Sequence, residues 1–176
     1  MTRPSDFQRV IISLFLVLLA LVLVVSPLPM LLRSLGILLL SYAAFSWGGI
    51  TLAYLVALLV PPAGLLTGDP NWLVMLPLIL SSGLLAMAGL EYAWRYPAIL
   101  ISPLLYIAPQ LFVWLVSYQP LFAINLPWEP SARTWISLHG LAALFAVLLL
   151  IYLERFKERR GHQHVSARSG RQSRNP

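Results

Sequence analysis

Cysteine is missing from this 176-residue chain, and charged side chains make up only 10% of it. Without cysteine, the chain cannot form a disulfide, a thiolate metal site or a cysteine nucleophile. Six acidic residues and three histidines remain for acid–base or metal chemistry. The sequence therefore offers few side chains from which a catalytic site could be built.

The common nucleotide-binding and catalytic motifs are also missing. The chain has no glycine-rich phosphate loop ending in Lys-Ser or Lys-Thr, no His-Glu-x-x-His and no Gly-x-Ser-x-Gly. The segment GHQH, residues 161–164, is too short to indicate a zinc site. We expect a protein that is not an enzyme and that uses no cofactor or metal.

Hydrophobic residues, in contrast, make up 59% of the chain, and the mean hydropathy is +0.81. This composition, with long uncharged runs, is typical of an integral membrane protein. We expect an all-α fold, a polytopic transmembrane helical bundle in residues 1–154, followed by a basic, disordered cytoplasmic tail in residues 155–176. The first apolar run, residues 10–25, is not followed by a signal-peptide cleavage site and is predicted to be a retained helix.

Prolines, glycines and charged residues divide the remaining apolar sequence into spans. Hydropathy predicts three later spans, at about residues 72–93, 97–118 and 133–153. Region 30–66 is ambiguous. It fits either one long helix, from about residue 34 to residue 60, or two short helices that turn at Trp47, Gly48 and Gly49.

Basic residues decide between these two possibilities. The tail is rich in Lys and Arg, and Arg3 and Arg9 precede the first apolar run, so the positive-inside rule places both ends in the cytoplasm. Ends on the same side require an even number of crossings, which favours six short helices over five. In a plasma (inner) membrane, Asp69 and Glu129 then lie outside and Arg95 lies inside.

Glu91 and Arg95 are four residues apart and are surrounded by Tyr92, Trp94 and Tyr96. Aromatic belts and exposed ion pairs at this spacing are typical of a helix end at the membrane interface. We therefore interpret the pair as the cytoplasmic edge of the fourth helix. The alternative is that it docks a partner or forms a cytoplasmic gate.

Few polar side chains remain for the membrane interior. His139 near the start of the last helix, and Gln110 after Pro109, are the candidate polar contacts. A helix–helix hydrogen bond accounts for His139, and a contact to a carbonyl freed by Pro109 accounts for Gln110. A ligand contact is the alternative for Gln110. Arg33 is near enough to the outer end of its helix to snorkel into the headgroups.

Small residues line one face of the fourth helix. Ser82 and Ala86 are one turn apart, with Gly83 and Gly89 nearby, and such a face lets another helix approach closely. We expect this face to make helix-packing contacts within the bundle, or alternatively with a partner. The basic tail is expected to contact anionic lipids rather than nucleic acid.

The layout resembles the rod-shape-determining MreD family, which in turn resembles the substrate-binding S components of energy-coupling-factor vitamin transporters. The features that carry the resemblance are the Trp47-Gly48-Gly49 turn, the external TGDP loop at residues 67–70 and the closing IYLERFKERR at residues 151–160. The resemblance implies a non-enzymatic membrane component of a cell-envelope synthesis machine that contacts other membrane proteins.

Two function classes stay open. The first is a membrane scaffold or assembly subunit of a cell-shape or peptidoglycan synthesis complex, and the second is a small-solute transport component. A polar-lined pocket that opens between Asp69 and Trp128 would favour transport. A solid core would favour the scaffold.

Overall fold

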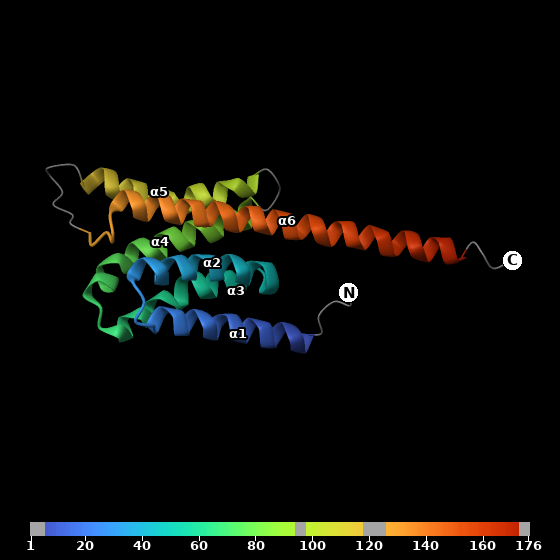
Figure 1. The fold of residues 1–176 in the computed structure, drawn as a ribbon, viewed down its shortest axis with the longest axis horizontal. Helices are drawn as coiled ribbons and strands as arrows, with labels where there is room; N and C mark the ends of the chain where they lie inside the picture. The colour runs from blue at the N-terminus through green and yellow to red at the C-terminus, as the bar shows by residue number, and fades with distance from the viewer. Residues whose placement is uncertain (1–5, 94–97, 118–125, 173–176) are drawn as a thin grey trace.

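The computed structural model describes residues 6–93, 98–117 and 126–172, and these residues form a bundle of six helices that run close to one long axis (Figure 1). The elements are α1 (Asp6–Val25), α2 (Met30–Gly48), α3 (Ile50–Tyr54) continued by η1 (Leu55–Leu59) and η2 (Pro61–Thr67), α4 (Pro70–Tyr92), η3 (Ala98–Leu100), α5 (Ile101–Ser117) and α6 (Ala132–Gln172). The predicted all-α bundle of six helices is confirmed.

Within the part of the chain that the structure describes, five helical segments are long and apolar enough to cross a membrane, namely Phe7–Val25, Met30–Gly48, Ile50–Thr67, Pro70–Tyr92 and Ala132–Tyr152. The α5 helix has 17 residues, which is at the lower limit of the ~17–25 residues that cross a bilayer. The short helix η3 directly precedes α5 and lengthens it. The chain is therefore a multi-pass membrane protein.

Gly49 makes the turn that divides region 30–66, as the sequence predicts. Its φ is 79°, a left-handed conformation that side chains other than glycine rarely adopt. Its N–H donates to the Phe45 carbonyl at 3.0 Å, which closes the last turn of α2. The chain reverses here, and α3 begins at Ile50.

The start of α1 and the C-terminal end of α6 lie at the same end of the bundle (Figure 1). The opposite end, here named the distal end, holds the α1–α2 connection, η2 and the start of α4. Gly68, with a φ of 70°, ends η2, and Asp69 and Pro70 begin α4 in the usual order of N-cap and first helical position. The six helices of the described residues thus return the chain to the end of the bundle where α1 begins.

The α2 helix is central, because it contacts α1, α3, α4 and α6. Buried apolar side chains form two clusters around it. One gathers at Trp72 and Trp135, and the other gathers at Tyr42, Met87 and Leu90. Large apolar side chains on the outside of the bundle, such as those exposed along α1, face where lipid would lie.

The α6 helix continues past Tyr152, where the apolar span ends, as far as Gln172. The basic segment that the sequence analysis separates as a disordered tail is thus continuous with α6 over most of its length. Arg is abundant in this segment and is a good helix former, which fits a helix that extends beyond the apolar span.

Candidate functional site

Arg33 and Asp69 form an ion pair at the distal end. Arg33 Nη2 donates to Asp69 Oδ2, and Nη1 lies 3.4 Å from the Val24 carbonyl oxygen and 3.5 Å from Thr67 Oγ1. The other Asp69 oxygen caps α4 by accepting from the Asn71 N–H at 3.0 Å. The Arg33 side chain is only 4% exposed. These acceptors hold the guanidinium inside the bundle instead of leaving it exposed at the helix end, and its Nε is buried without a partner.

Trp72 lies against this ion pair. The Arg33 guanidinium carbon lies 4.5 Å from the centroid of the Trp72 ring, within the range of a cation–π contact. Trp72 Nε1 donates to the Pro61 carbonyl at 3.0 Å, and Gly64 packs so closely that a Cβ there would lie 2.2 Å from Nε1. We name Arg33, Asp69 and Trp72 the distal clamp. It joins the ends of α1, α2, η2 and α4, and its two charges compensate each other.

His139 joins α6 to α2. Its Nδ1 lies 2.9 Å from the Trp135 carbonyl oxygen, which can only accept, so Nδ1 carries a proton. Its Nε2 lies 3.0 Å from Ser34 Oγ, which also donates to the Leu31 carbonyl at 2.9 Å. The imidazole is fully buried and stacks on Trp135, with centroids 4.6 Å apart, and on Tyr106 at 5.9 Å. The structure thus places this candidate in a helix–helix hydrogen bond.

Gln110 joins α5 to α4. Its Nε2 lies 3.4 Å from Ser82 Oγ and 3.4 Å from the Tyr106 carbonyl oxygen, while Oε1 is buried without a partner. Pro109 deprives the Leu105 carbonyl of its helical donor. The carbonyl that Gln110 contacts is the neighbouring one, that of Tyr106. Gln110 and Ser82 are thus brought together, which sequence spacing alone does not show.

The small-residue face of α4 is turned inward. A Cβ at Gly89 would lie 3.0 Å from Ser102 Cα on α5, and a Cβ at Gly83 would lie 3.2 Å from the Ala57 carbonyl oxygen on η1. Ser82 and Ala86 are fully buried. Ser102 Oγ on α5 donates to the Ala86 carbonyl of α4 at 2.8 Å and lies 2.7 Å from Tyr42 Oη of α2, so α5 is bonded to both helices. This face therefore packs α4 within the bundle.

Glu91 lies exposed in the last turn of α4, where its Oε2 accepts a hydrogen bond from Tyr54 Oη at 2.8 Å. This bond links α4 to α3 at the end of the bundle that holds the termini. Arg95, the expected partner, lies outside the described residues. Glu91 is at a helix end, as the sequence indicates. Its bond to the Tyr54 hydroxyl could not be predicted, because no pattern in the sequence pairs residues 37 positions apart.

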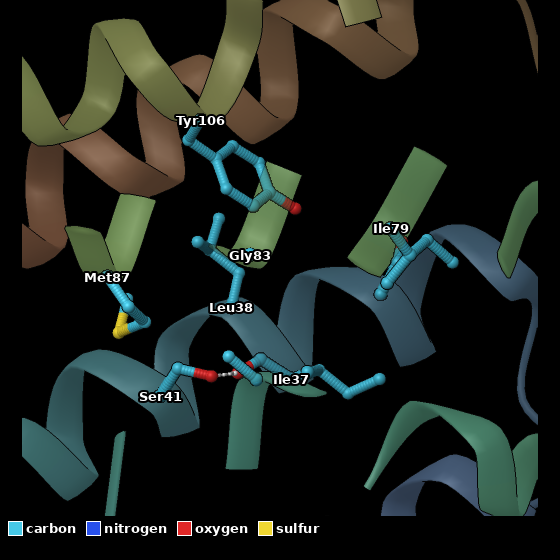
Figure 2. A pocket seen from close by; sticks show the side chains of 9 residues that line it. Ile37, Leu38, Ser41, Ile79, Gly83, Met87 and Tyr106 are labelled. Carbon is cyan, nitrogen blue, oxygen red and sulfur yellow. Dashed lines mark hydrogen bonds between the residues drawn. The ribbon is translucent and has the colours of Figure 1, made fainter. Parts of the chain in front are cut away.

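A cavity of about 10 Å³ lies between α2, η1, α4 and α5 (Figure 2). It is lined by Ser34, Ile37, Leu38, Ser41, Ala57, Ile79, Gly83, Met87 and Tyr106. Ligand pockets for small molecules are commonly ~300–1,000 Å³. This cavity is too small for a solute, and its lining residues do not include Asp69 or Trp128.

No family model, curated protein or solved structure matches this chain. The geometry of the bundle is therefore the ground for any proposal about function.

Proposed function

We propose that the protein is a non-enzymatic membrane scaffold or assembly subunit. The observation that supports this proposal is the pattern of hydrogen bonds in the interior of the described bundle. Its buried polar side chains bond mainly from one helix to another, as His139 does to Ser34 and as Ser102 does to the Ala86 carbonyl. Such contacts fix the helices relative to one another, which is what a protein that presents surfaces to partners requires.

The transport alternative needs a place for a solute. The cavity of about 10 Å³ is more than tenfold smaller than the ~300 Å³ at which ligand pockets commonly begin. The two opposite charges of the distal clamp are paired with each other. The geometry therefore favours the scaffold.

The partner class follows from the resemblance to the MreD family, which points to membrane proteins of a cell-envelope synthesis complex. The basic segment beyond Tyr152 favours an orientation with both ends in the cytoplasm, and it would contact anionic lipids of a plasma (inner) membrane.

Purification in a mild detergent through an affinity tag, followed by quantitative mass spectrometry, tests the proposal. We expect cell-envelope synthesis proteins to copurify with the chain. A variant that ends at Tyr152 is the matched control, because it removes the basic segment that could capture anionic material without specificity. Copurification of an ATPase module, in place of envelope-synthesis proteins, would support the transport alternative and contradict the proposal.

A further inference from the structure

The third membrane span changes its helix type along its length. It is α-helical at Ile50–Tyr54, π-helical at Leu55–Leu59 and 3-10 at Pro61–Thr67. Pro61 and Pro62 cause this change, because neither has an N–H to donate. In an α-helix the Ala57 carbonyl would accept from residue 61, and in a π-helix it would accept from residue 62. Both donors are missing.

A carbonyl without its helical donor needs another partner inside a membrane, since lipid offers none. Ala57 is 2% exposed, so bulk solvent does not reach it. Its carbonyl oxygen is directed at Gly83 of α4, where an added Cβ would lie 3.2 Å away. Because Gly83 has no side chain, space remains next to this oxygen, and both residues line the cavity of about 10 Å³.

Hydroxyl groups supply the rest of the polar lining. Ser34 and Ser41 line the cavity from α2, and Tyr106 reaches towards Leu38 from α5 (Figure 2). The Ser41 hydroxyl donates to the Ile37 carbonyl at 2.8 Å, which leaves its oxygen able to accept. The lining contains no acidic or basic side chain. An occupant of this cavity is therefore a neutral molecule that can both donate and accept hydrogen bonds.

We propose that the cavity binds one water molecule, which donates to the Ala57 carbonyl and bonds to the surrounding hydroxyls. A buried water needs ~10–15 Å³ of such space and two to four polar partners, and the cavity offers about 10 Å³. The bound water replaces the two N–H groups that the prolines lack. It allows the broken span to lie inside the bundle, and this assignment does not depend on the proposed function.

X-ray hydroxyl-radical footprinting of the intact protein in lipid nanodiscs tests this site, because radicals form at bound water and oxidise adjacent side chains. Met87 and Met75 are a matched pair on α4. Both are fully buried, but Met87 lines the cavity and Met75 does not. We expect Met87, together with Tyr106, to be oxidised several-fold faster than Met75.

The Gly83→Ala variant provides a second test of the water site. Its methyl group would occupy space next to the Ala57 carbonyl and displace the water, so Met87 oxidation should fall to the rate of Met75. Equal rates at Met87 and Met75 in the unmodified protein would overturn the proposal. Fast Met87 oxidation that Gly83→Ala leaves unchanged, with Met75 still protected, would also overturn it, since the water would then bind elsewhere.

Discussion

Arg33 on α2 and Asp69 before α4 form an ion pair across 36 residues of sequence, with Trp72 stacked on the guanidinium. The pair lies where four helical segments end, and each segment leaves backbone groups without helical partners there. Arg33 bonds to a carbonyl at the end of α1, while Asp69 caps α4. This ion pair thus supplies hydrogen-bond partners to backbone groups at the ends of α1 and α4, and its two charges compensate each other.

Asp69→Asn is expected to destabilise the bundle by about 2 kcal/mol, because Arg33 is buried but Asp69 is 25% exposed. This lies between the ~0–1 kcal/mol of surface ion pairs and the ~3–5 kcal/mol for breaking a fully buried one. Asparagine keeps an oxygen for the α4 cap but leaves the buried Arg33 charge uncompensated. The double variant Arg33→Met/Asp69→Asn should recover part of this loss. Unfolding free energies from denaturant titration in micelles would measure both.

Glu129→Gln is the matched control for Asp69→Asn. Glu129 is an exposed carboxylate whose Oε1 lies 3.4 Å from Asn71 Nδ2, so its neutralisation should cost less than about 1 kcal/mol. If Asp69→Asn were as mild as Glu129→Gln, the distal clamp would have no role in stability.

Gly64→Ala should destabilise the bundle by about 1–3 kcal/mol, the usual cost of overpacking. The added Cβ would lie 2.2 Å from Trp72 Nε1, and the fully buried ring is held by its bond to the Pro61 carbonyl. Gly36→Ala is the control, because its Cβ would meet only the end of the flexible Leu23 side chain at 2.1 Å. Thermal unfolding of the two variants should separate them, and a Gly36→Ala loss as large as that of Gly64→Ala would contradict the reasoning.

The six-helix layout could be predicted from the sequence, because it follows from local signals. Trp47-Gly48-Gly49 marks a turn that only glycine accepts readily, and hydropathy marks the other spans. The parity of crossings then favours six helices over five. Each signal lies within a few residues, so tertiary packing was not needed to interpret it.

The distal clamp could not be predicted in the same way. Topology alone places both Arg33 and Asp69 near the distal end, but four other helices could have stood between them. The bond from Tyr54 to Glu91 and the contact of Gln110 with Ser82 likewise depend on helix rotation. Hydropathy over these uniformly apolar helices does not fix rotation, because many faces are similarly apolar.

Ser82→Leu should be more damaging than Ser81→Leu, although the residues are adjacent. Ser82 is fully buried and accepts from Gln110, whereas Ser81 is half-buried and bonds to the Leu78 carbonyl of its own helix. Leucine at position 82 must separate α4 from α5, at an expected ~1–3 kcal/mol. The yield of monodisperse protein after detergent extraction, and its unfolding free energy, would compare the two variants. Equal losses would contradict the inward orientation of this face.

The last prediction concerns orientation. The start of α1 and the C-terminal end of α6 lie at one end of the bundle (Figure 1). Asp69 caps the start of α4 at the distal end, and Glu129 lies beside Asn71 there. The positive-inside rule assigns the basic end to the cytoplasm. Because the chain has no cysteine, single cysteines at Glu129 and Gly170 can be labelled without background. An impermeant thiol reagent added to intact cells should label Glu129→Cys but not Gly170→Cys, and permeabilised cells should show both. Labelling of Gly170→Cys alone in intact cells would show the opposite orientation, and labelling of both would contradict a crossing of the membrane by α6.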